Sequence, residues 1–129
     1  MSDRDARTPT PAELRILRIL WRLGPSTVHE VHAALATEKS VGYTTALKIL
    51  QVMTEKELVE RETVGRAHRY RPVAAEETTQ RQLLRDLVDR AFGGSVDALV
   101  LRALSDADVP QTDVEEIERL LSRERERRS

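Results

Sequence analysis

Cysteine is absent from this chain of 129 residues, and aromatic residues make up only 3% of it. The absence of cysteine excludes disulfides, thiolate metal sites and a cysteine nucleophile. No apolar run approaches the roughly 20 residues that span a bilayer, and the N-terminal segment lacks the apolar stretch of a signal peptide. We therefore expect a cytoplasmic protein without membrane insertion, whose core is built from aliphatic side chains.

The net charge of −1 conceals an uneven distribution of charge along the chain. Residues 1–72 contain 12 Lys and Arg against 9 Asp and Glu, whereas residues 73–129 contain 9 against 13. Hydrophobic residues make up 40% of the chain, which is enough to bury a core. The asymmetry indicates a basic face in the first part and a different kind of partner for the second.

Capping signals predict the first two helices. The segment Thr10–Glu13 has the spacing of a capping box with proline at the first helical position, and Gly24 marks the end of that helix. A second helix is expected over residues 28–36, capped by Ser26 or Thr27. The positions expected to face the core of these helices are Leu14, Ile16, Leu17, Ile19, Leu20, Trp21, Leu23, Val28, Val31 and Leu35.

After the third helix, the spacing of hydrophobic residues changes from that of a helix to that of a strand. Gly42 or Tyr43 begins this helix, which is expected to run to about Leu58. Residues 58–64 and 69–73 then have the pattern of two strands, joined by a loop over residues 65–68. Three helices followed by a hairpin form the winged variant of the helix-turn-helix. The apolar face expected for the third helix consists of Ala46, Leu47, Leu50 and Met53.

Three more helices are expected after the hairpin. The first ends at the glycine pair 93–94, Ser95 caps the second, and Thr112 with Glu115 has the spacing of a capping box for the third. These roughly 55 residues bury too little surface to be stable alone, so we expect a homodimer. The residues expected at the dimer contact are Leu83, Leu84, Leu87, Val88, Phe92, Leu99, Val100, Leu104, Ile117, Leu120 and Leu121.

The start of the third helix is the candidate nucleic-acid site. In a helix-turn-helix, the N-terminal residues of the second helix of the pair meet base edges in the major groove. Threonine can bond to bases or touch a thymine methyl, lysine can reach guanine or a phosphate, and basic residues in the hairpin suit the sugar-phosphate backbone. The candidates are Tyr43, Thr44, Thr45 and Lys48 on the helix, and Arg66, His68 and Arg69 in the hairpin.

The predicted fold class is therefore mainly α with a small β-hairpin, in which a winged helix-turn-helix precedes a three-helix dimerisation region. We expect a flexible N-terminus (1–9), a DNA-binding domain (10–73), a dimerisation domain (74–122) and a charged tail (123–129). Alternatively, Tyr43, Thr44 and Thr45 form an ordinary N-cap cluster on a surface helix. A second alternative, favoured by the near-neutral net charge, is a winged-helix module that binds proteins and not DNA.

The remaining sequence patterns predict no metal site and no catalytic site. The segment His29–His32 lacks the four-residue separation of the two histidines in a zinc protease motif, and no third ligand is evident. The sequence has no glycine-rich phosphate loop and no nucleophile elbow. We expect no catalytic residue, no metal and no cofactor, so the chain is not predicted to be an enzyme.

These segments resemble the penicillinase repressor family of the BlaI/MecI type. The similar segments are residues 13–21, residues 27–35, Tyr43-Thr44-Thr45, Leu58-Val59, residues 65–70, and residues 92–95 with Leu99, Val100 and Leu101 after them. The resemblance implies a homodimeric repressor that binds a palindromic operator. It also implies regulated genes for a β-lactamase or for a membrane metalloprotease sensor, whose signal leads to cleavage of the repressor in its dimerisation region.

The chain departs from the family at several positions. Arg102-Ala103 stands where cleavable members have an Asn-Phe bond, and the cysteines of a copper-responsive branch are absent. Many members have an arginine where Val52 stands and a glycine where Glu57 stands. The first of these two changes removes a possible phosphate contact from the third helix.

Overall fold

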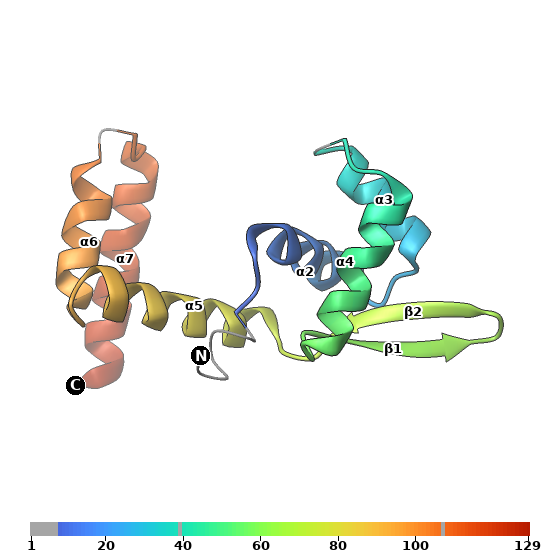
Figure 1. Cartoon of the computed structure of the whole chain (residues 1–129). Coiled ribbons are helices and arrows are strands. Elements are labelled where there is room, and N and C mark those ends of the chain that lie inside the picture. Colours follow the sequence, from blue (N-terminus) through green and yellow to red (C-terminus); the bar gives the residue numbers. More distant parts are fainter. Residues whose placement is uncertain (1–7, 39, 107) are drawn as a thin grey trace. The chain divides into compact units, whose positions relative to one another are not determined.

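The computed structural model describes residues 8–38, 40–106 and 108–129. These residues form six helices, with a two-stranded antiparallel sheet between the third and the fourth (Figure 1). The prediction of a mainly α fold with a small hairpin is confirmed. Of the N-terminus predicted to be flexible, residues 1–7 lie outside the described residues. The elements are α2 (Pro11–Leu23), α3 (Val28–Ala36), α4 (Tyr43–Glu55), β1 (Val59–Val64), β2 (Ala67–Pro72), α5 (Glu76–Ala91), α6 (Val96–Ser105) and α7 (Gln111–Arg128).

The chain divides into two compact units, one ending at Leu83 and one beginning at Leu84. This division falls inside α5, whereas the sequence analysis places the boundary between the DNA-binding and dimerisation domains at Val73. No helix among the described residues combines the length and the apolar character needed to cross a bilayer.

Complete capping boxes begin both α2, as its sequence predicts, and α3. The backbone N–H of Glu13 donates to Thr10 Oγ1 at 3.2 Å, and the N–H of Thr10 donates to Glu13 Oε1 at 2.9 Å. Thr27 and Glu30 make the same two bonds, at 3.2 and 3.0 Å. Thr27, not Ser26, is therefore the N-cap of α3.

The core of the first unit lies between α2, α3, α4 and the hairpin. A backbone bridge between Ser26 and Tyr70, with N···O distances of 3.0 and 2.8 Å, joins the α2–α3 connection to β2. The side-chain N–H of Trp21 donates to the carbonyl of Ala74 at 3.0 Å, which fixes the segment after β2 against α2. Leu23 was predicted to face the core but is 52% exposed, because the buried stripe of α2 ends at Leu20. The buried core residues are Ile16, Leu17, Ile19, Leu20, Val28, Val31, Leu35, Ala46, Leu50, Met53, Val59 and Tyr70.

One ion pair in this unit is largely removed from water. Lys56 Nζ lies 2.9 Å from Glu13 Oε1, and the exposed fractions of the two side chains are 28% and 4%. The pair joins the first turn of α2 to the C-cap residue of α4. Glu13 therefore serves both the capping box and the packing of two helices.

The third helix ends three residues earlier than predicted, at Glu55 instead of Leu58. Glu57 adopts a φ of 63°, the only positive φ of a non-glycine residue among those described. This left-handed conformation stops the helix, and it costs an ordinary residue about 1–2 kcal/mol. The N–H of Leu58 then bonds to the carbonyl of Met53 at 2.9 Å, and the chain continues into β1.

The hairpin turn is shorter than predicted. It consists of Gly65 and Arg66, because Val64 pairs directly with Ala67. The second strand therefore begins at Ala67, two residues before the predicted start at residue 69. Gly65 has a φ of 64°, which a two-residue turn accepts most easily from glycine.

The helices after the hairpin begin and end mostly as predicted. Ser95 Oγ accepts from the N–H of Ala98 at 3.1 Å and caps α6, as its sequence predicts. The N-cap of α7 is Pro110 and not the predicted Thr112, because α7 begins before that threonine, at Gln111. The helix then continues to Arg128, through the segment predicted to be a charged tail separate from the dimerisation domain.

Candidate nucleic-acid interface

The two sides of α4 differ sharply in burial. Ala46, Leu50 and Met53 are each 0% exposed and fix one side of the helix in the core. The residues predicted to meet bases are exposed on the other side. Figure 1 shows α4 packed across α2, with the hairpin extending beyond these helices. The described structure thus presents a rigidly held helix with a polar outer face that consists of Thr44, Thr45 and Lys48.

The start of α4 is built differently from the starts of α2 and α3. Its N-cap is Gly42, which offers no side-chain hydrogen bond to the first turn. The first N–H groups of a helix carry a partial positive charge and attract anions such as phosphate. A backbone phosphate of DNA is therefore a suitable partner for the start of α4.

Two histidines of α3 surround Tyr43 at this point. The ring centroids of His29 and Tyr43 are 5.0 Å apart, and those of His32 and Tyr43 are 5.9 Å apart. His32 Nε2 donates to the carbonyl of Val41 at 2.8 Å, which fixes the connection between α3 and α4. Tyr43 itself is 40% exposed. The histidines thus position the start of α4. Among the described residues, no three His, Cys, Asp or Glu are arranged to hold a metal ion.

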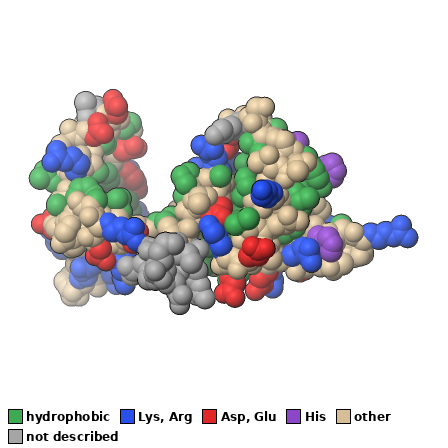
Figure 2. Space-filling view, in the orientation of Figure 1, with side chains coloured by type: hydrophobic (Ala, Val, Ile, Leu, Met, Phe, Trp, Pro, Cys, Tyr) green, Lys and Arg blue, Asp and Glu red, His purple; other side chains and the backbone are tan. Residues whose placement is uncertain are grey.

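The hairpin carries basic side chains to its tip. Arg66 occupies the second position of the turn and is exposed. Figure 2 shows Lys and Arg side chains at the far end of the hairpin. A guanidinium at the end of a projecting hairpin is well placed to contact a phosphate beside the groove that α4 would enter.

The other two predicted hairpin residues lie on opposite faces of the sheet, because neighbouring residues of a strand alternate. His68 pairs with Thr63, and its Nδ1 lies 3.2 Å from Thr63 Oγ1. Arg69 pairs with Glu62 on the other face. Hydrogen bonds from Thr27 lower the pKa of the Glu30 carboxyl, and the charge of Arg69 lowers it further. Arg69 therefore lies near enough to Glu30 of α3 to influence its carboxyl, a proximity that the sequence could not reveal.

The sequence analysis did not include three exposed residues near this surface among the candidate DNA contacts, and it considered Val52 only as a departure from the family. His29 was considered only as a metal ligand, and its contact with Tyr43 depends on how α3 and α4 pack. Gln51 and Val52 extend the exposed side of α4 beyond its first turns. The helical spacing from Thr44 was the available signal for these two residues, because positions three, four and seven apart share a face.

In the second unit, most residues predicted at the dimer contact are accessible. Leu84, Leu87 and Val100 are 47%, 48% and 39% exposed. Val88 is only 5% exposed, because it is already covered within the chain. The exposed set also contains Val96 and Leu101, which the prediction omitted. Of the remaining predicted residues, Leu104, Leu120 and Leu121 are exposed, and Leu83, Phe92, Leu99 and Ile117 are half-buried.

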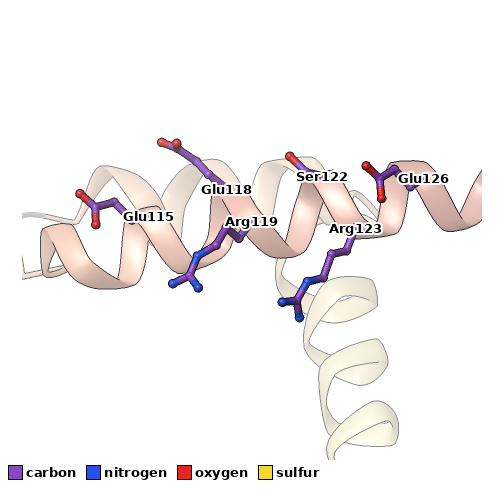
Figure 3. A pocket seen from close by; sticks show the side chains of 6 residues that line it. All are labelled: Glu115, Glu118, Arg119, Ser122, Arg123 and Glu126. Carbon is purple, nitrogen blue, oxygen red and sulfur yellow. The ribbon is translucent and has the colours of Figure 1, made fainter.

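A shallow pocket follows one side of α7 (Figure 3). Carboxylates and guanidiniums three or four residues apart line it, which is the pattern of a solvated helix face. Such a surface offers no nucleophile with an adjacent base. The lining residues are Glu115, Glu118, Arg119, Ser122, Arg123 and Glu126.

Comparison with known proteins matches most of the chain to one family. A family model described as penicillinase repressor matches residues 9–123. The transcriptional regulator BlaI of Mycobacterium tuberculosis strain CDC 1551 / Oshkosh is 36% identical over 80 residues, and so is that of strain H37Rv. The match covers 61% of this chain and 58% of each regulator, so the chain spans less than two thirds of the curated relatives it matches.

Two solved structures are similar to this chain, and the first of them supports the fold. A MarR family protein from Bacillus stearothermophilus matches with a TM-score of 0.52 and 20% identity, over 97% of this chain and 81% of that one. The BlaI monomer of Bacillus licheniformis, solved in complex with the blaP half-operator, matches with a TM-score of 0.48 and 22% identity, over 53% of this chain and 83% of that one.

Proposed function

The chain belongs to the penicillinase repressor family, and on that premise we propose that it binds double-stranded operator DNA and represses transcription. The family is one of transcriptional repressors and not of enzymes. The observation that carries the proposal is α4, whose buried side is fixed in the core and whose outer side exposes Thr44, Thr45 and Lys48. A helix held in this way can lie in the major groove and bring those side chains to base edges.

The proposed contacts divide into two kinds. Thr44, Thr45 and Lys48 read bases, whereas Tyr43 and the backbone N–H groups at the start of α4 hold a phosphate. The hairpin contacts the sugar-phosphate backbone, and Arg66 at its tip is the principal contact. His68 and Arg69 approach the DNA from opposite faces of the hairpin, so each contacts a different strand or groove edge.

A salt titration tests DNA binding. Fluorescence anisotropy with a selected duplex measures affinity between 50 and 200 mM salt, and log affinity is expected to fall with log salt at a slope of about 0.9 per phosphate contact. Affinity that depends on neither salt nor sequence would contradict the proposal. It would favour the winged-helix module that binds proteins, the alternative consistent with a net charge of −1.

Alanine variants separate the two kinds of contact. Lys48→Ala and Thr45→Ala are expected to reduce the preference for operator over random DNA by about tenfold, because base contacts specify sequence. Arg66→Ala is expected to weaken binding to both DNAs about equally and to reduce the salt slope by about one contact. Arg119→Ala removes the same charge from α7 and serves as the matched control. A reversed pattern would place the hairpin in the major groove.

We further propose that a second copy of the chain covers the exposed apolar residues of the second unit. Leu87, Val96 and Leu101 are 48%, 57% and 68% exposed, and α6 and α7 contain no buried residue. Two copies related by a two-fold axis would bury these residues in a self-complementary contact. Sedimentation during dilution from micromolar to nanomolar concentration should show dimers dissociating to monomers; monomers throughout would contradict this part.

Two copies of α4 related by a two-fold axis imply a palindromic operator. Half-sites read by such dimers lie a whole number of helical turns apart. An insertion of about 10 base pairs between half-sites should therefore weaken binding less than an insertion of about 5, which places the second half-site on the opposite side of the duplex. Equal losses would indicate that each copy binds independently.

We propose genes for a β-lactamase or for a sensor protease as the regulated targets, on the support of the family to which the chain belongs. DNA from upstream of these genes in the source genome should be bound at least tenfold more tightly than unrelated promoter DNA. A membrane metalloprotease sensor is the proposed signalling partner. Arg102 and Ala103 lie inside the helix α6. We therefore expect incubation with that protease to leave the bond between them intact.

A further inference from the structure

The exposed side of α4 is longer than the group of residues at its start. Taking Thr44 as the reference, Lys48, Gln51 and Val52 lie four, seven and eight positions further along, and all are exposed. Residues at these spacings share one face of a helix. The opposite side is fixed by Leu50 and Met53, both 0% exposed, so this face cannot rotate away from a ligand that meets its first turn.

Val52 is an apolar side chain within this polar face. It is 37% exposed, and it belongs neither to the core cluster nor to the partly buried hydrophobic residues packed against that cluster. A single exposed valine on a protein surface needs no explanation by itself. Here, however, Val52 lies one turn beyond Lys48 on the helix proposed to enter the major groove. The thymine 5-methyl is the apolar group that a base pair displays in that groove.

Gln51 stands next to Val52 and is also exposed. Its amide carries a carbonyl acceptor and an NH₂ donor, which match N6 and N7 on the major-groove edge of adenine. Adjacent helix residues point about 100° apart, so Gln51 and Val52 face different bases. Glu55 lies on the same face one turn later, where its carboxylate would be repelled by DNA phosphates. The readable part of α4 therefore ends before Glu55.

We propose that Gln51 and Val52 are specificity-determining residues, with Gln51 binding adenine and Val52 packing against a thymine methyl. This inference rests on the proposed DNA binding and extends it. The half-site would contain two kinds of position: those read by Thr44, Thr45 and Lys48, and adjacent A·T pairs read by Gln51 and Val52 on the third turn of α4. An arginine at position 52 would contact a phosphate and carry no such preference.

Base analogues test each contact at the level of single atoms. Deoxyuridine in place of one thymidine removes only the 5-methyl group, and 7-deazaadenine in place of adenine removes only the N7 acceptor. With the intact protein, one deoxyuridine position is expected to weaken binding about threefold to fivefold, as expected for one buried methyl group. One 7-deazaadenine position is expected to weaken binding about fivefold to tenfold, as expected for one lost hydrogen bond of a bidentate pair.

Combining each protein variant with each base analogue tests which residue contacts which base. Val52→Ala should bind the thymidine and deoxyuridine duplexes equally, and Gln51→Ala should bind the adenine and 7-deazaadenine duplexes equally. Val73→Ala and Gln82→Ala alter an exposed valine and an exposed glutamine outside α4, and both should keep the full analogue sensitivity of the unaltered protein. Fluorescence of Trp21 and circular dichroism confirm that each variant is folded.

The possible outcomes separate this inference from the proposed function. Sequence-selective binding in which Val52→Ala and Gln51→Ala retain the sensitivity of the unaltered protein would overturn the inference and leave DNA binding in place. The same holds if no analogue position weakens binding of the unaltered protein. Absence of salt-dependent binding to any duplex would instead overturn the proposed function. Loss of analogue sensitivity in the matched variants alone supports the inference.

Discussion

In the first unit, Ile16, Val31 and Leu50 are completely buried, whereas α6 and α7 of the second unit contain no buried residue. Apolar content does not explain the contrast, because the second unit also carries many aliphatic side chains. Three helices and a hairpin enclose a core when they pack on several sides. The helices of the second unit leave Val96 and Leu101 more than half exposed. The proposed association with a second copy would supply the missing burial.

A charge placed on the second unit should disturb this contrast most. Leu87→Asp removes an apolar contact from each of two copies, and burial of a leucine contributes about 1.5–3 kcal/mol. We expect the dimer to lose about 3–6 kcal/mol, which raises its dissociation constant at least about 100-fold. Sedimentation measures the change. Leu23→Asp is the control, because Leu23 is similarly exposed (52%) but belongs to the first unit. Dimers of Leu87→Asp at micromolar concentration would locate the interface elsewhere.

The first unit should respond to loss of a core side chain, whatever the protein concentration. Leu50→Ala is expected to lower the free energy of unfolding by about 2–5 kcal/mol, because it leaves a cavity in a closed core. Trp21 is the only tryptophan of the chain and reports on this unit during urea unfolding. Leu23→Ala, at the exposed end of α2, should change the free energy by less than about 0.5 kcal/mol. Equal losses would mean that the unit lacks a distinct core.

Two ion pairs of the first unit allow a finer comparison between buried and exposed charges. Glu13→Gln removes the charge that faces Lys56 and is expected to cost about 1–3 kcal/mol, because the glutamate side chain is 4% exposed. Glu60→Gln removes the partner of Arg71, and both of these side chains are 53% exposed. Its cost should stay below about 1 kcal/mol. Urea unfolding of the two variants measures the difference, and equal costs would contradict a special role for Glu13.

A smaller effect of opposite sign is expected where α4 ends. Glu57→Gly should stabilise the first unit by about 0.5–1 kcal/mol, because glycine accepts a φ of 63° without the steric cost that glutamate bears. Glu55→Gly, two residues earlier in the helix, should instead destabilise by about 0.5–1 kcal/mol. Destabilisation by both changes would show that Glu57 contributes contacts that outweigh its backbone conformation.

The sequence predicted features that depend on neighbouring residues and missed those that depend on distant ones. The capping box of Thr10 and Glu13 was visible from a spacing of three residues. The pairing of Ser26 with Tyr70 was not visible, because it joins positions 44 residues apart. The length of α4 was overestimated, since nothing in the pattern marks Glu57 as left-handed.

In the candidate site, too, features set by local spacing were predicted and features set by distant packing were missed. The exposed start of α4 followed from helical spacing, and its residues lie where they were expected. The separation of His68 from Arg69 depends on strand register, which the predicted loop over residues 65–68 obscured. The contact of His29 with Tyr43 depends on the packing of two helices. Val88 shows the same limit in the second unit, where burial within the chain removes it from a predicted interface.

Acid should affect the two units differently, and this is the smallest expected change. Hydrogen bonds from Arg127 and then Arg128 lower the pKa of Glu124 to about 2. A carboxyl whose pKa is lowered in the folded helix stabilises it above its ordinary pKa near 4.5, and that contribution disappears as the pH falls toward 2. We therefore expect the last turn of α7 to lose helicity between pH 4.5 and 2, with little energy involved because these groups are exposed.

Nuclear magnetic resonance can follow this local change through the Cα shifts of residues 125–128. Glu124→Gln carries no titrating carboxyl, so its last turn should be less helical at neutral pH and should change little on acidification. The Trp21 fluorescence of the first unit provides the internal comparison, since no group of the last turn belongs to that unit. If the unaltered chain and Glu124→Gln lost the same helicity over the same pH range, the ion pairs of Glu124 would not stabilise the end of α7. The whole second unit would then respond to acid through its other carboxylates.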